Sequence, residues 1–372
     1  MYKFFLTLFI FSLHLVASCQ TKEKVDVLKL YQYKDPFSLI SNRTVKVNTE
    51  NAYKVENNLS KNRSTKENTM IIQEALNKYD KVLLPNFSIN IERNGLKLKS
   101  NQVLIFQNNT QLNMEPNELA SYAILHINGV NNVKVYNAKL RGDKEKHIGV
   151  SGEAGHGISI LGSSNVEVLG FDIRDFWGDG IFIGRYEKQV NKNVLIEKGI
   201  VDNNRRNGIS IVSVEGLVLK NVVASNSNGT MPMFGVDIEP HFWVDEANNI
   251  KIINLTTYNN ANGGLMVSIN KIKEGGDKEV NINISDYTDI NSYHGISLGG
   301  ITSDFKGLRG SLNFKKTTLI NNIKPIKLRD NHISNFTVNF DNFNVVSPKN
   351  KYFTTKEATR LIKLKTNFTI KN

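Results

Sequence analysis

The sequence has a single cysteine, Cys19, among 372 residues, which excludes an intramolecular disulfide. It has no basic stretch interleaved with aromatic residues and no nucleic-acid motif, so nucleic acid is not expected as a partner despite a formal charge of +12. Its one long apolar run, residues 4–16, is too short to span a membrane. The positive charge has two interpretations, a solvated basic surface or attraction to an acidic polymer.

The first 19 residues resemble a bacterial lipoprotein signal peptide. Lys3 supplies the charged start, an apolar run follows, and Val16-Ala17-Ser18-Cys19 places small residues before the cysteine that receives the lipid. We therefore expect export, lipidation of Cys19 and attachment to the cell envelope (periplasm or outer membrane) through the lipid alone. An ordinary secretory signal with a chance cysteine is the alternative. Residues 20–60 are polar and predict a tether that leads into first strands or a cap.

A short phrase, Gly-apolar-x-apolar, recurs from the middle of the chain to near its end. The spacings between copies are 23 to 31 residues. The copies begin at Gly157, Gly180, Gly208, Gly235, Gly264 and Gly295, and a last copy begins at Pro325. A fixed period of this size with strands inside it indicates a solenoid or a propeller.

The content of each repeat favours the solenoid. A second strand of the form Asn-Val-x-Val follows the glycine strand, as in Asn165-Val166-Glu167-Val168, and a third apolar stretch ends in Asn-rich turns. Propeller blades need about 40 residues or more, whereas three short strands in each repeat suit one turn of a parallel β-helix. Stacked Asn side chains form hydrogen-bonded ladders at such turns. The sequence therefore predicts an all-β fold, a single right-handed parallel β-helix over residues 61–372.

A helix is expected at residues 64–80, ahead of the repeats. Ser64-Thr65-Lys66-Glu67 has the spacing of a capping box, and apolar residues follow it at helical period. Strands are expected at Val82-Leu83-Leu84-Pro85 and Ile89-Asn90-Ile91. A helix in this position would cover the open end of the solenoid, whose exposed edge otherwise invites aggregation.

The run from Asn68 to Leu76, with Val82-Leu83-Leu84-Pro85 and residues 95–101, resembles the opening of the pectate-lyase-like superfamily. That superfamily includes the polygalacturonase-type enzymes of glycoside hydrolase family 28, and Gly155-His156-Gly157 is similar to their Gly-His-Gly phrase. The resemblance covers residues 64–330 and implies the right-handed parallel β-helix. No Asn-Thr-Asp or Asp-Asp phrase precedes His156 here, so the histidine of those enzymes is not carried over and pectin is not implied as substrate.

The outward positions of the glycine strands are mostly neutral. The position two residues after each glycine reads Ser159, Phe182, Ser210, Asp237, Met266, Ser297 and Lys327. Only one strand places two carboxylates outward, Asp237 and Glu239, with Cα atoms about 6.6 Å apart at a rise of ~3.3 Å per residue. Glycosidic cleavage uses such a pair, one acid to protonate the leaving oxygen and one to activate water or attack. We therefore predict Asp237 and Glu239 as catalytic acids; a solvated pair and a calcium site are the alternatives.

Asp179 is a third candidate acid, just before Gly180. Two turns separate it from Asp237, about 9.6 Å at ~4.8 Å per turn. A Gly-Asp-Gly turn with a purely structural role is the alternative. Arg205 and Arg206 lie on the intervening turn, where an arginine can bind a uronate or a sulfate by two hydrogen bonds. Ion pairing with Asp179 or Asp237 is the other possibility.

Residues 141–156 form an insertion that departs from the regular turn, and such loops commonly carry function. His147, Glu153 and His156 are therefore expected to line a groove, and their spacing matches no zinc pattern. Trp177 is expected either to stack on a sugar ring or to pack against neighbouring turns. The predicted substrate-binding residues are Arg205, Arg206, His156, His147, Glu153, Trp177 and His241.

These observations predict an exported, monomeric glycoside hydrolase that acts on an anionic polysaccharide and needs no metal or cofactor. One alternative is a polysaccharide lyase, in which Arg205, Arg206 or a histidine removes a proton beside a uronate and calcium binds the acids. The other is a glycan-binding β-helix without catalytic activity, which the neutral outward face of most turns favours.

Overall fold

The computed structural model describes residues 38, 40, 43–55, 59, 63–299, 307–329, 335–347, 353–365 and 368–371. The strands and helices named below lie within Asn42–Asn372, the larger of two units into which the chain divides. The predicted signal peptide, its lipidation site Cys19 and most of the predicted tether lie outside the described residues. Within the described ranges, no helix has both the length and the apolar character needed to cross a membrane.

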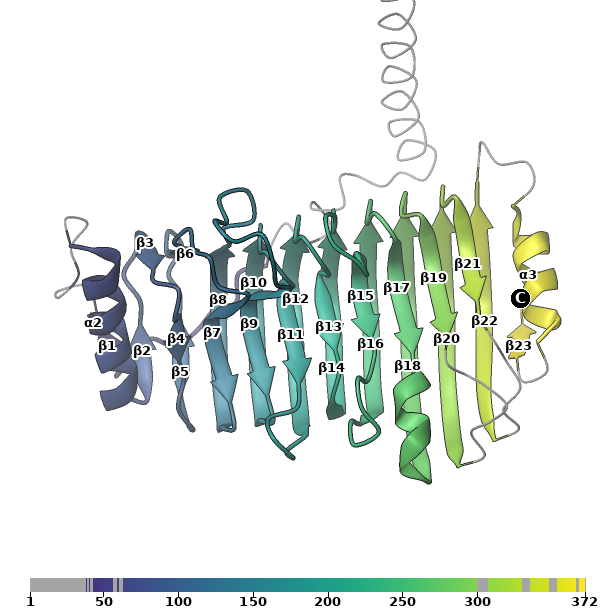
Figure 1. Cartoon of the computed structure of the whole chain (residues 1–372), viewed down its shortest axis with the longest axis horizontal. Coiled ribbons are helices and arrows are strands. Elements are labelled where there is room, and N and C mark those ends of the chain that lie inside the picture. The colour runs from purple at the N-terminus through teal and green to yellow at the C-terminus, as the bar shows by residue number, and fades with distance from the viewer. Residues whose placement is uncertain are drawn as a thin grey trace, which may run out of the picture. The chain divides into compact units, whose positions relative to one another are not determined.

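Two parallel sheets run the length of a coil, with their strands stacked in chain order (Figure 1). In the described part of the chain, sheet A has fourteen strands: β1 (Tyr53–Lys54), β2 (Lys81–Leu83), β3 (Ser88–Ile91), β5 (Val103–Ile105), β6 (Gln111–Met114), β8 (Asn131–Arg141), β10 (Ser164–Arg174), β12 (Asn191–Asp202), β14 (Val214–Ser225), β16 (Ala247–Tyr258), β18 (Lys278–Ile290), β20 (Leu308–Ile320), β22 (Phe336–Val346) and β23 (Phe368–Lys371). Sheet B has nine: β4 (Leu96–Lys97), β7 (Ser121–Asn128), β9 (Ala154–Leu161), β11 (Ile181–Gly184), β13 (Ile209–Ile211), β15 (Phe234–Ile238), β17 (Gly263–Ser268), β19 (His294–Gly299) and β21 (Lys324–Leu328). The predicted parallel β-helix is confirmed.

The second and third strands expected in each turn are joined into one long, bent strand of sheet A. The bend is a residue with left-handed backbone, and these residues stack in register from turn to turn, for example Lys198 (φ 69°), Asn221 (φ 54°) and Asn254 (φ 52°). The same bend occurs at Asn342 (φ 55°) within β22. The coil therefore still has three flat sides.

The glycine repeat comes from close contact between successive turns. A Cβ at Gly208 would lie 2.4 Å from the carbonyl oxygen of Gly235, and a Cβ at Gly180 would lie 2.8 Å from that of Gly208. No side chain fits at these distances. Pro325 belongs to β21, the last strand of sheet B among the described residues, so no further turn excludes its ring. The repeat therefore marks the positions where backbones stack.

Asparagine ladders stabilise the corners. The Asn132 side chain donates to Asn101 at 2.9 Å, Asn165 to Asn132 at 3.0 Å and Asn193 to Asn165 at 3.2 Å. A second ladder at the Asn-rich turns includes a bond of 2.7 Å from Asn259 to Asn226. Asn tolerates the left-handed backbone of these corners and bonds to its neighbours above and below, which explains why it recurs there.

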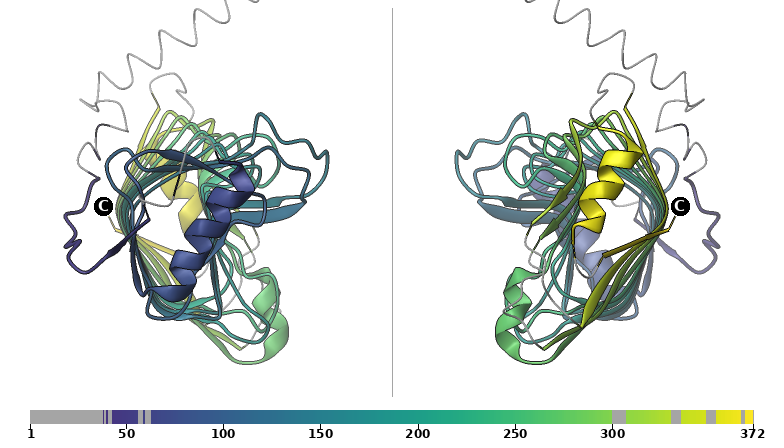
Figure 2. Two further views of the ribbon diagram at one scale, coloured as in Figure 1. Left: turned by 90° about the vertical axis from the view of Figure 1, so that its left-hand side faces the viewer. Right: turned by 90° about the vertical axis from the view of Figure 1, so that its right-hand side faces the viewer.

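A helix covers each end of the coil (Figure 2). α2 (Thr65–Lys78) begins at the predicted capping box, in which the Ser64 side chain accepts from the Glu67 N–H and the Glu67 side chain accepts from the Ser64 N–H. Its residues Ile72 and Leu76 are fully buried. α3 (Thr355–Lys363) packs against β22 and β23 at the other end. Both ends of the coil therefore lie beneath helices, as the sequence predicted for the N-terminal end.

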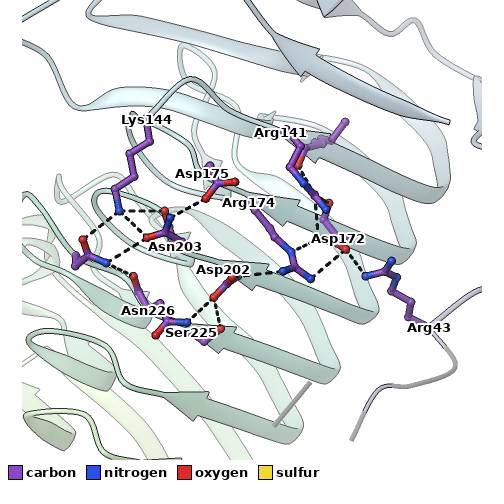
Figure 3. A network of polar contacts seen from close by, with 12 residues as sticks. Arg43, Arg141, Lys144, Asp172, Arg174, Asp175, Asp202, Asn203, Ser225 and Asn226 are labelled. Atoms are coloured by element: carbon purple, nitrogen blue, oxygen red, sulfur yellow. Dashed lines mark hydrogen bonds and ion pairs between the residues drawn. The ribbon is translucent and has the colours of Figure 1, made fainter. Parts of the chain in front are cut away.

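A charged network lies on the last segment of the sheet A strands (Figure 3). Asp172 accepts from Arg174 at 2.5 Å, lies 3.0 Å from Arg141 and is bonded to Arg43, which is 129 residues away in sequence. Burial alone would raise the pKa of Asp172, but the hydrogen bonds and charges of these arginines lower it to about 2. The network joins the segment around Arg43 to the coil.

Candidate functional site

Asp237 projects from the outer side of sheet B and is nevertheless buried. Its backbone pairs with Ser210 on one side and Met266 on the other, while Val236 and Ile238 point into the core. Only 2% of Asp237 is exposed, so it is not a solvated surface acid. The remaining question is which groups share its enclosed position.

One oxygen of the Asp237 carboxyl has a partner and the other has none. Oδ2 accepts a hydrogen bond of 3.1 Å from the side-chain amide of Asn207, and that amide also donates to Ser210 at 3.0 Å. Oδ1 is buried without a hydrogen-bond partner. Burial, followed by the charge of Glu239, raises the pKa of Asp237 well above its usual range, and the charge of Arg206 opposes them. This environment favours the protonated carboxyl.

Glu239 stands just beyond the end of β15, two residues after Asp237. Its N–H donates to the Ile211 carbonyl at 3.0 Å, which continues the strand pairing by one position. Glu239 is half-buried, whereas Asp237 is almost fully buried. Its charge contributes to the raised pKa of Asp237. The pair therefore combines an enclosed acid and an accessible one.

Asp179 is held by three neighbours. Arg206 Nη1 lies 3.2 Å from Oδ2 and 3.4 Å from Oδ1, and the Asn207 N–H donates to Oδ1 at 2.9 Å. The Asp179 N–H donates to His156 Nδ1 at 3.2 Å. Asp179 is fully buried, so the donors from Arg206 and Asn207 compensate for the loss of water around its carboxylate.

His156 is a neutral histidine with a defined tautomer. Because Nδ1 accepts the bond from Asp179, the ring proton lies on Nε2. Burial lowers the pKa of His156 to about 4, and the nearby charge of Asp179 only partly opposes this effect. The ring stacks on Phe182, with centroids 4.9 Å apart. His156 therefore presents a hydrogen-bond donor at Nε2 rather than a base.

Arg206 is at the centre of the acids. Besides its bonds to Asp179, its Nε lies 3.3 Å from Oε2 of Glu153. Burial would lower the pKa of Arg206, but the charges of Asp179, Asp237, Glu153 and Glu239 raise it. Four carboxyls from three turns therefore influence one guanidinium, and the structure brings together Asp237, Glu239, Asp179, Glu153, His156 and Arg206.

The other predicted residues have different environments. Arg205 stacks on Trp177, with its guanidinium carbon 3.7 Å from the ring centroid, and donates to the Gly152 carbonyl at 3.0 Å. His147 stacks on the same ring at 4.1 Å. These three side chains hold the segment between β8 and β9 against the coil. His241 is exposed beyond the strand, and its N–H donates to Asp245 at 3.0 Å.

The segment between β8 and β9 has further anchors. His147 Nδ1 lies 2.9 Å from Asp143, and both side chains are fully buried. Lys144 donates to the Asn203 side chain at 2.9 Å and to Asn228 at 3.1 Å (Figure 3). In Figure 2 this teal-blue segment projects from the same side of the coil as the green η3 (Asn270–Gly275). Glu153 is therefore carried by a loop that is firmly attached.

Sequence reasoning did not select two residues of the cluster, Asn207 and Ser210. Asn207 is fully buried and contacts both Asp179, through its N–H, and Asp237, through its side chain. Its position directly before Gly208, matching that of Asp179 before Gly180, was the available signal. Among the described residues, no group of three His, Cys, Asp or Glu side chains is arranged to hold a metal ion.

Comparison with known proteins identifies the fold. A family model described as a right handed beta helix region matches residues 77–238. The uncharacterized protein YclG of Bacillus subtilis (strain 168) is 28% identical over 162 residues, which are 39% of this chain and 27% of that protein. The chain thus matches about a quarter of the length of the curated relatives, 27% and 28%.

Two solved structures cover most of this chain. The endo-xylogalacturonan hydrolase from Aspergillus tubingensis has a TM-score of 0.56 at 14% identity and covers 79% of this chain and 85% of its own. The A-module of the mannuronan C-5 epimerase AlgE6 from Azotobacter vinelandii has a TM-score of 0.53 at 14% identity, covering 86% and 98%. At this identity the likeness concerns the fold alone. The chain therefore has the right-handed parallel β-helix fold.

Proposed function

We propose that the protein is a glycoside hydrolase that acts on an anionic polysaccharide. The observation that carries the proposal is the Asp237 carboxyl, which is enclosed, has a raised pKa and leaves Oδ1 without a partner beside the accessible Glu239. A general acid must hold its proton until the leaving oxygen arrives, and enclosure of this kind favours that state.

The two acids have separate roles in this proposal. Asp237 protonates the glycosidic oxygen, and Glu239 activates water or attacks the sugar, as paired carboxylates do in glycoside hydrolysis. Asp179 and Asn207 are positioning residues, because Asp179 fixes Arg206 and Asn207 orients Asp237. His156 offers its Nε2 proton as a donor to the substrate. The polysaccharide-active enzymes named above support carbohydrate as the substrate class at the level of the fold.

The contacts of the candidate bases disfavour the lyase alternative. Arg206 is paired with Asp179 and Glu153, Arg205 is stacked on Trp177, and the bond to His156 Nδ1 leaves that ring a donor at Nε2. None of the three is poised to take a proton from a uronate. A glycan-binding protein without activity is the other alternative, and the same assay tests it.

The test uses residues 20–372 with a panel of neutral, uronic and sulfated polysaccharides. Reducing ends and ultraviolet absorbance are recorded together for wild type and Asp237→Asn. Reducing ends without absorbance, lost in the variant, are the expected result. Absorbance from a new conjugated double bond would indicate a lyase. The absence of both reducing ends and absorbance across the panel would favour a binding protein.

We also propose that the protein works outside the cytoplasm as a lipoprotein. The support is the sequence Val16-Ala17-Ser18-Cys19 after an apolar run, together with the absence of any other cysteine. Mass spectrometry of the protein from a membrane fraction should find lipid on Cys19, and Cys19→Ser should release the protein from the membrane. An unmodified Cys19 in a membrane-bound protein would contradict the proposal.

A further inference from the structure

We propose that Arg206 is an anion-binding subsite and that Glu153 occupies it until a carboxylate or sulfate of the substrate takes its place. The inference rests on the proposed function, because it names the chemical group that the same site recognises.

The two partners of Arg206 differ in how firmly they are held. Asp179 is fully buried and makes a second bond to the Asn207 N–H. Glu153 has 60% of its side chain exposed, and Arg206 is the one ion-pair partner that the described residues give it. An exposed carboxylate of this kind leaves its partner at low cost, since exposed ion pairs contribute little to stability.

The contact with Glu153 leaves a donor of Arg206 unsatisfied. Nε lies 3.3 Å from Oε2, within ion-pair distance, yet it makes no hydrogen bond and is buried. The Arg206 side chain is only 13% exposed. A buried guanidinium N–H without an acceptor is costly, and a better placed anion would satisfy it.

The charges near this point also suit an incoming anion. Arg205 and Arg206 are adjacent, and Arg205 Nη1 is bonded to the carbonyl of Gly152, directly before Glu153. When the carboxylate of Glu153 swings into solvent, Arg206 keeps its contact with the buried carboxylate of Asp179 and loses the negative group nearest its Nε. A negative group on the sugar can take the place of the Glu153 carboxylate, whereas a neutral sugar cannot.

The position of the subsite fits the proposed chemistry. Asp237 and Glu239 affect the pKa of Arg206, so the anion would bind close to the acids that cleave the chain. Only the Glu153 side chain has to move, because the loop that carries it stays attached through Arg205, Trp177 and His147. Glu153 therefore mimics the substrate group in the free protein.

Calorimetric binding in an Asp237→Asn background tests this inference without turnover. The probes are hexasaccharides of mannuronate, galacturonate and ι-carrageenan, with cellohexaose as the neutral probe, so carboxylate and sulfate are compared directly. Replacing Glu153 with Gln should tighten binding of the anionic probe that the background binds by about two- to fivefold, which corresponds to the loss of one exposed ion pair. Arg206→Lys should weaken binding of the same probe by about tenfold, since lysine lacks the planar fork.

A matched control separates the subsite from general charge. Glu145→Gln removes an exposed carboxylate from the same segment that is not among the ion-pair partners of Arg206 in the described structure, and it should leave the affinity unchanged. Equal effects of Glu145→Gln and Glu153→Gln, full affinity in Arg206→Lys, or no preference of the background for an anionic probe would each overturn the inference. Reducing ends released by the wild-type protein, which retains Asp237, are measured separately. Turnover without this binding pattern refutes only the subsite, and the binding pattern without turnover refutes only the hydrolase.

Discussion

Asp237 and Asp172 are both buried acids on the outer sides of the same coil, at 2% and 3% exposure, and their environments are opposite. Asp172 is surrounded by Arg43, Arg141 and Arg174, and its pKa is about 2. Asp237 has one amide donor and an oxygen without a partner, and its pKa is raised. Burial alone therefore does not identify a functional acid. The number and charge of its partners distinguish a structural acid from a candidate catalytic acid.

The largest expected effect is the loss of turnover in Asp237→Asn. General acid catalysis contributes about 10²- to 10⁴-fold, and an amide cannot supply the proton. We expect turnover to fall by about that factor, measured as reducing ends, with the melting temperature little changed, because the oxygen of the new amide can still accept from Asn207. Turnover within about threefold of wild type would show that a residue other than Asp237 is the general acid.

Asp172→Asn should lower stability and leave turnover unchanged, the reverse of what is expected for Asp237→Asn. It leaves three arginines around an amide, and removing one member of a buried charged group costs about 3 kcal/mol. Urea denaturation should show this loss, while turnover at a temperature where the variant is folded should match that of wild type. Unchanged stability would mean that the arginines are adequately solvated without the carboxylate, and the contrast with Asp237 would lose its basis.

A third buried acid, Asp289, sharpens the comparison through pH. It accepts from the Thr257 hydroxyl at 2.5 Å and the Ser292 hydroxyl at 2.7 Å, and from the Asn322 amide. Burial raises the pKa of Asp289 to about 7, against the effect of these donors. A raised pKa in the folded state means that its contribution is fully present below the unfolded pKa of 3.8 and is lost as pH rises through about 7.

Asp289→Asn should remove that dependence. Asn322 has a side-chain oxygen without a partner and can turn its amide to accept from the new residue. Relative to wild type, the variant should gain stability as pH rises from 4 to 7, by at most about 1.4 kcal/mol per pH unit. The same comparison for Asp172→Asn should have the opposite sign and be confined below pH 4. A pH-independent difference for Asp289→Asn would show that its carboxyl does not titrate in this range.

The smallest effect is expected at the corner ladder. Asn165 has a φ of 55° and bonds to Asn132 and Asn193. Asn165→Ala should cost about 1–2 kcal/mol from strain and lost bonds, whereas Asn165→Gly removes the bonds without the strain. Thermal denaturation of both variants separates the two contributions, and turnover should be unaffected. A larger loss in the glycine variant than in the alanine variant would contradict this division.

Much of the fold could be predicted because its causes are local or periodic. The glycine repeat records a contact between the backbones of successive turns, as at Gly208, and the capping box at Ser64 and Glu67 fixes the start of α2. The merging of two strands into one bent strand was missed because residues such as Lys198 have no strong preference for the left-handed backbone that they adopt.

The candidate site could be predicted only in part. Alternation along the strand placed Asp237 and Glu239 outward, and the structure has them so. The burial of Asp237 could not be predicted, because the groups around it come from other turns, such as Asn207, 30 residues away. The Arg43–Asp172 pair spans 129 residues, and no pattern in the sequence links the two. Contacts of this kind follow from the coil and not from the local sequence.

The most direct test is the protonation state of Asp237 near neutral pH. Difference infrared spectroscopy between wild type and Asp237→Asn isolates the carbonyl stretch of this one group. Asp289→Asn is present in both proteins, because the pKa of Asp289 is raised to about 7. If Asp237 is the proton donor, the band of a protonated carboxylic acid is present at pH 7 and is replaced by that of a carboxylate only at higher pH. A carboxylate band at pH 7 would contradict the assignment of Asp237 as the proton donor.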